Sequence, residues 1–111
     1  QRRARAFANA RKRVKVLSGA VERDAAERLV GAFKSFLGDI FDCSGGALTT
    51  KDIALRLVDA GFPEQRVEEI RIRLNALESV VFGGRVIAGP EFETAKKWFL
   101  GAMKEIDHKC V

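Results

Sequence analysis

Few side chains of this 111-residue chain have the type and spacing that catalysis or metal binding requires. The single histidine, His108, lies near Cys110, and the other cysteine, Cys43, is distant in the sequence. A zinc site usually takes four ligands, and Cys43 has no neighbouring histidine to act as its base. We therefore expect no metal and two free thiols in a reducing compartment, although one disulfide between the two cysteines remains an alternative.

The remaining candidates for chemistry are pairs of carboxylates and pairs of glycines. Asp39 with Asp42, and Glu68-Glu69, are flanked by polar residues, which is typical of a solvated helix face and not of an acid/base pair. Gly45-Gly46 and Gly83-Gly84 match neither a P-loop nor a dinucleotide-binding motif. We expect a protein that is not an enzyme and has no cofactor and no small-molecule substrate.

Charge is divided unevenly along the chain, whose formal net charge is +5. Residues 1–21 hold seven basic residues and no acidic one, whereas residues 22–111 hold thirteen basic and fifteen acidic residues. A short basic arm on a nearly neutral body predicts local attachment to anionic lipid beside a membrane anchor, or to nucleic acid. The basic residues of the arm are Arg2, Arg3, Arg5, Arg11, Lys12, Arg13 and Lys15.

Apolar residues recur at helical spacing through most of the chain. This pattern predicts an all-α bundle of five helices, with a basic helical arm over residues 1–20 and a single helical domain over 21–111. The apolar stripe of the arm is narrow, which would let that helix project from the bundle. Predicted core residues are Leu29, Phe33, Phe36, Leu37, Ile40, Ile53, Leu57, Ile70, Leu74, Leu77, Phe92 and Phe99.

Turn and capping residues divide the second half of the chain. Thr49 with Asp52 predicts a capping box, Gly61 a left-handed helix stop, and Pro63 the first residue of the next helix, which should end near Val80. Residues 82–89 alone have the character of a short hairpin. Two helices followed by a hairpin would resemble a winged helix-turn-helix.

A small winged-helix DNA-binding protein is therefore an alternative function. The helix after Pro63 begins with Glu64 and carries Glu68-Glu69 in its first two turns, and these carboxylates would repel a phosphate backbone. We expect no nucleic acid as a partner. Instead, Phe82, Val86 and Ile87 lie among glycines and offer a candidate surface for a protein partner, unless they cap the core, which is the commoner outcome for such residues.

The chain resembles the cytoplasmic tail domain of the BatD family, bacterial proteins of aerotolerance. The resemblance covers about the first 82 residues and rests on hydrophobic spacing and turn residues. A basic helix (2–17) precedes a long helix that ends in Phe36-Leu37, and Leu48-Thr49 then starts a short helix that stops at Gly61. The next helix has an acidic residue shortly before an aromatic one, here Glu78 and Phe82. The glycine-rich residues after Phe82 depart from the family pattern, in which a proline soon follows.

Membership of that family implies a single-pass inner-membrane protein with immunoglobulin-like domains outside and this domain at the cytoplasmic face. The implied role is a non-enzymatic part of a membrane complex in stress and oxygen tolerance. The implied protein partners are von Willebrand A-domain membrane proteins and a MoxR-type AAA ATPase. We expect the chain to be a piece of a longer protein with a transmembrane helix upstream of Gln1, and the basic arm agrees with positive-inside placement.

Overall fold

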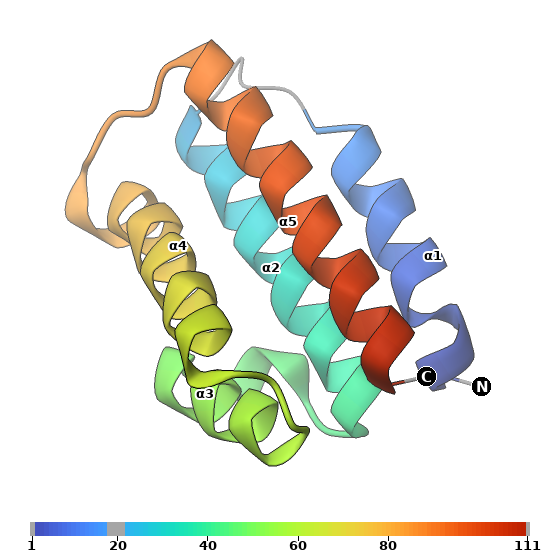
Figure 1. Cartoon of the computed structure of the whole chain (residues 1–111). Coiled ribbons are helices and arrows are strands. Elements are labelled where there is room, and N and C mark those ends of the chain that lie inside the picture. The colour runs from blue at the N-terminus through green and yellow to red at the C-terminus, as the bar shows by residue number, and fades with distance from the viewer. Residues whose placement is uncertain (1, 18–21, 111) are drawn as a thin grey trace.

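The computed structural model describes residues 2–17 and 22–110, and Figure 1 shows their arrangement. The described residues contain five α-helices and no strand, which confirms the predicted all-α five-helix bundle. The expected boundary between residues 20 and 21 lies outside the described residues. The helices are α1 (Arg2–Lys15), α2 (Glu22–Phe41), α3 (Thr50–Asp59), α4 (Glu64–Gly83) and α5 (Gly89–Cys110), with a short 3₁₀ turn at Gly45–Ala47.

Helices α2 and α5 lie side by side at the centre, with α1 on one side of them and α4 on the other (Figure 1). All twelve predicted core residues are buried. The rings of Phe33 and Phe99 meet edge to face with their centroids 5.1 Å apart, joining α2 to α5. The wide apolar face of α2 therefore has the several neighbours that its hydrophobic pattern demands.

The prediction that the first helix projects from the bundle is wrong, because α1 packs along both α2 and α5. Its buried residues are Ala6, Ala10 and Val14, which recur every four residues and so share one face. Two of the three are alanines, whose small side chains let α1 approach its neighbours closely. The narrow apolar stripe of α1 therefore packs closely against the bundle.

The predicted signals around α3 are present with small shifts in position. The side chain of Thr49 accepts a hydrogen bond from the backbone N–H of Asp52, and the Asp52 carboxylate accepts one from the N–H of Thr49, which completes the capping box. Gly61 has a φ of 95°, as a left-handed helix stop requires. Pro63 precedes the first residue of α4 and does not itself begin the helix.

The hairpin expected at residues 82–89 does not form. α4 continues to Gly83 and is capped by Gly84 in the left-handed conformation, which leaves only residues 84–88 before α5. Five residues are too few for two paired strands and a turn. Ile87 instead inserts into the core, and Arg85 binds Glu91 and the carbonyl of Ala76, so this segment joins α4 to α5 without a wing.

Glu78 connects three helices through its carboxylate. One oxygen accepts a hydrogen bond from Thr50 Oγ1 at 2.8 Å, and the other lies 3.2 Å from Nζ of Lys34. The side chains of Lys34 and Glu78 are only 19% and 20% exposed, so this ion pair is partly shielded from water. The ion pair holds α2 against α4, and the hydrogen bond from Thr50 joins the start of α3 to them.

Candidate functional site

The seven cations of the basic arm all lie on α1, and two of them are bound within the molecule. Arg2 places Nε 3.1 Å from Asp39 and Nη1 2.9 Å from Asp42, and it also donates to the carbonyl of Cys43 at 3.1 Å. Arg3 donates to the carbonyl of Ile40 at 3.0 Å. Both arginines therefore bind the C-terminal end of α2.

These contacts have a local physical cause. The last carbonyls of a helix have no partner within the helix and carry the negative end of its dipole. Arg2 and Arg3 supply hydrogen-bond donors and positive charge at that end. The carboxylates of Asp39 and Asp42 raise the pKa of Arg2 further above its ordinary value. Asp42 is 80% exposed, as the predicted solvated face requires, whereas Asp39 is 27% exposed, and both carboxylates also bind Arg2.

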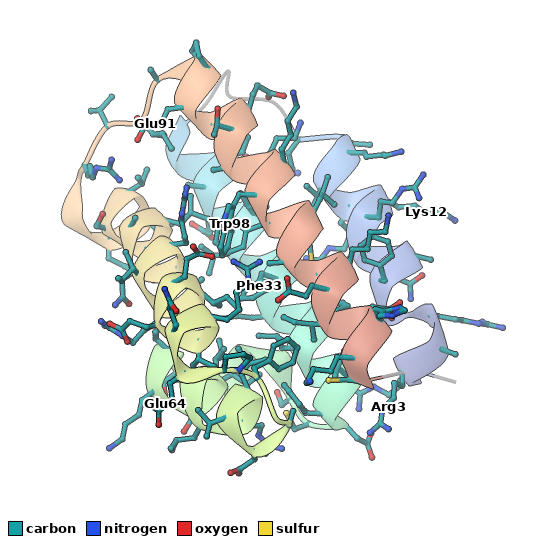
Figure 2. The ribbon with its side chains drawn as sticks, in the orientation of Figure 1. Arg3, Lys12, Phe33, Glu64, Glu91 and Trp98 are labelled. Carbon is teal, nitrogen blue, oxygen red and sulfur yellow. The ribbon has the colours of Figure 1, made fainter. Side chains whose placement is uncertain are left out.

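The other five cations of the arm are exposed and form no ion pair with any carboxylate among the described side chains. They are Arg5, Arg11, Lys12, Arg13 and Lys15. Figure 2 shows Lys12 on the side of α1 that is turned away from α2 and α5. We call these five residues the outward basic face. No carboxylate among the described side chains neutralises their positive charge, so we treat these residues as the candidate site for an external anion.

Helix α5 carries exposed lysines of its own. It packs directly against α1, and its exposed Lys97 and Lys104 are seven residues apart, which places them on one side of the helix. Lys96 reaches the residues that follow α1, since its Nζ donates to the carbonyl of Leu17 at 2.6 Å. The charge pattern along the sequence did not indicate this contribution, because α5 also carries acidic residues and adjoins α1 only in the folded chain.

Of the three residues predicted to form a partner surface within residues 82–87, two are exposed and one is buried. Phe82 is 80% exposed and Val86 is 73% exposed, but Ile87 is 3% exposed and belongs to the core. The inclusion of Ile87 in that surface is therefore wrong. Phe82 and Val86 remain large apolar side chains in water, near the end of α4.

The thiols and acidic residues form no reactive centre in the part of the chain that is described. Cys43 and Cys110 are both free and half-buried, and burial raises the pKa of the Cys110 thiol, which lowers its reactivity. His108 is exposed on the last turns of α5. Among the described residues, no three His, Cys, Asp or Glu side chains gather in a way that would hold a metal ion.

The first two turns of α4 present carboxylates to solvent, as the sequence predicts. Glu64, Glu68 and Glu69 are exposed there. The neighbouring cations are already paired, since Arg66 binds Glu69 and Glu105, and Arg71 binds Glu68. The hydrogen bonds that the Arg71 guanidinium donates lower the pKa of Glu68 below its ordinary value. Glu68 and Glu69 are thus paired with arginines, whereas Glu64 has no ion pair among the described side chains, so the start of α4 offers no free cation to a phosphate backbone.

Comparison of the chain with protein-family models, with curated proteins and with solved structures finds no match in any of the three. Among the described residues, none of the helices combines the length and the apolar character needed to cross a membrane.

Proposed function

We propose that this chain is a non-enzymatic interaction domain at the cytoplasmic face of a bacterial inner membrane, and that α1 rests on anionic lipid through its outward basic face. The observation that carries the proposal is the division of the arm. Arg2 and Arg3 hold α1 on the bundle, while five further cations are exposed without a carboxylate partner among the described side chains.

Charge of this kind suits a lipid surface better than a single bound ion. The five cations lie between Arg5 and Lys15, roughly 15 Å of helix at 1.5 Å per residue, so those on one side of α1 can contact several headgroups at once. Each cation close to an anionic leaflet contributes about 1 kcal/mol. Lys97 and Lys104 of the neighbouring helix add to the attraction if α5 also approaches the surface.

The resemblance to the BatD tail supports the same placement. A transmembrane helix upstream of the chain would deliver α1 directly to the cytoplasmic leaflet, and positive charge next to that helix favours this orientation. The proposed protein partners are those that the resemblance implies, von Willebrand A-domain membrane proteins and a MoxR-type AAA ATPase. Phe82 and Val86 are candidates for contact with such a partner, because both are apolar and exposed.

Co-sedimentation with vesicles tests the lipid contact. We expect the protein to bind vesicles containing phosphatidylglycerol at low salt, and to bind neutral phosphatidylcholine vesicles far less. Replacing Arg5 and Lys12 by Gln should weaken binding about 30-fold, which corresponds to about 1 kcal/mol for each charge. The matched control replaces Lys51 and Arg73 by Gln. This pair is exposed on α3 and α4, and the control has the same net charge.

Three results would contradict the proposal: equal binding to both kinds of vesicle, no binding to either at low salt, or equal losses in the two double variants. Steeply salt-dependent retention of any DNA duplex, without vesicle binding, would instead assign the basic face to nucleic acid. The residues encoded upstream of Gln1 give an independent check. A run of about 20 apolar residues ending there is expected.

A further inference from the structure

A small cavity of about 120 Å³ opens between α4, the segment 84–88 and α5. Its apolar lining includes Leu77, Ile87, Ala95, Trp98 and Phe99, and charged and polar side chains complete the walls. Figure 2 shows Trp98 in the space between α4 and α5. The cavity is much smaller than the roughly 300–1,000 Å³ of a typical small-molecule site, so it suits one apolar side chain and not a cofactor.

Two arginines among the described residues line this cavity, and they differ in whether they have a hydrogen-bonded partner. Arg85 is engaged, since it donates to Glu91 at 2.9 Å and to the carbonyl of Ala76 at 3.3 Å. Arg73 lies with its guanidinium carbon 5.1 Å from the centroid of the Trp98 ring. Arg73 is exposed and has no ion pair with a described carboxylate.

From this arrangement we infer that the α4–α5 cavity is a docking site for an acidic peptide segment of a protein partner, which inserts one apolar side chain between α4 and α5 and pairs an adjacent Asp or Glu with Arg73. An arginine can bind a carboxylate through two parallel hydrogen bonds, and the stacked ring of Trp98 holds this guanidinium in place. An apolar anchor beside a charged contact is a common mode of peptide recognition.

The charge around the cavity selects for an acidic peptide. Among the described residues, Glu91 is the one carboxylate that lines the cavity, and it is already paired with Arg85, so Arg73 leaves the mouth positive. A basic peptide would be repelled there, and a purely apolar one would leave Arg73 unpaired. This inference rests on the proposed function only in treating the chain as an interaction domain, because the cavity lies on the α4 side of α5 and the outward basic face lies on α1.

The chain contains one tryptophan and no tyrosine, so its fluorescence reports directly on the cavity. The test selects peptides from a random heptapeptide display library on the immobilised domain, without lipid, and titrates the winning peptide in solution. We expect the enriched peptides to hold an apolar residue next to Asp or Glu. Binding of the synthetic peptide should shift the emission of Trp98.

Two variants and one control locate the binding. Arg73→Gln removes the cation and Ala95→Leu fills the cavity, and each should weaken peptide binding about tenfold or more. Arg71→Gln makes the same change of charge on α4, at a residue that is paired with Glu68 and does not line the cavity, and it should leave binding unchanged. Thermal unfolding followed by circular dichroism verifies that each variant is folded.

Several outcomes would overturn the inference. They are no enrichment, enrichment of peptides without acidic residues, binding that survives either Arg73→Gln or Ala95→Leu in a folded protein, and equal losses with Arg71→Gln. A shift of the Trp98 emission that depends on protein concentration in the absence of peptide would indicate that a second copy of the chain occupies the cavity. Because the assay contains no lipid, its failure leaves the vesicle result unaffected, and the reverse is also true.

Discussion

The Nη1 atom of Arg2 lies 2.9 Å from Oδ1 of Asp42, although the two residues are forty positions apart in the chain. Nε of the same guanidinium lies 3.1 Å from Oδ1 of Asp39. These contacts join the first turn of α1 to the C-terminal end of α2. A segment that sequence alone presents as a free basic arm is therefore held against the bundle.

Loss of this contact should loosen the beginning of α1 and leave the rest of the fold intact. In Arg2→Ala we expect faster amide hydrogen exchange over the first turns of α1 and unchanged exchange in α4, because α1 packs mainly on α2 and α5. Arg5→Ala is the control, since Arg5 is exposed and has no ion pair with a described carboxylate. Equal exchange in the two variants would show that the Arg2 contacts do not hold α1.

The core should be sensitive to truncation at Phe36 and tolerant of it at Phe82. Phe36 is 1% exposed, and Phe36→Ala should lower the free energy of unfolding by about 3–5 kcal/mol. Phe82 is 80% exposed, so Phe82→Ala should change stability by less than about 0.5 kcal/mol. Urea unfolding measures both. Similar losses at the two positions would contradict the packing described for α2 and the exposure described for the end of α4.

The ion pair between Lys34 and Glu78 should contribute more than the exposed pairs on α4. Glu78→Ala leaves the partly buried ammonium group of Lys34 without its carboxylate and removes the acceptor of Thr50, so it should cost about 1–3 kcal/mol. Glu68→Ala, which removes the exposed partner of Arg71, should have a much smaller effect. Chemical denaturation compares them, and equal effects would mean that Glu78 does not join α2 to α4.

The capping box of α3 should make stability depend on pH under acidic conditions. The backbone N–H of Thr49 donates to the Asp52 carboxylate and lowers its pKa in the folded state below the ordinary 3.8. The stabilisation is therefore complete above pH 3.8 and is lost as the pH falls through the lower folded pKa.

Urea unfolding between pH 6 and pH 2.5 measures this dependence. In Asp52→Asn the loss of stability on acidification should be smaller than in the wild type, since one carboxylate no longer takes up a proton. Thr49→Ala should cost about 1 kcal/mol at neutral pH, because the N–H of Asp52 loses its acceptor. Identical pH profiles in the wild type and Asp52→Asn would contradict the contribution of the capping box.

The helices, their core faces and the capping box could be predicted from the sequence because each depends on residues near one another in the chain. The position of α1 could not, since it depends on Arg2 and Arg3 finding the end of α2 across some forty residues. The hairpin prediction failed for a local reason. Glycines permit either a tight turn or a left-handed helix cap, and the burial of Ile87 against the core decides in favour of the cap at Gly84.

The same distinction applies to the candidate functional site, part of which could be predicted from the sequence. The local excess of positive charge on α1 was visible in the sequence, whereas its separation into two bound arginines and an outward basic face required the fold. The cavity beside Trp98 gave no signal in the sequence. It is built from α4, α5 and the segment between them, and an unpaired arginine is recognised only when its neighbours are known.

Contact between the outward basic face and anionic lipid is tested most directly by quenching of a tryptophan placed within that face. Ala8 is exposed on α1 between Arg5 and Lys12, so Ala8→Trp in a Trp98→Phe background reports on this surface alone. With vesicles of brominated phosphatidylglycerol we predict strong quenching at low salt that fades in about 1 M salt, where screening shortens to about 3 Å. Ile72→Trp on α4, in the same background, should remain unquenched. No quenching at Ala8, or equal quenching at both positions or with brominated neutral lipid, would contradict the proposed function.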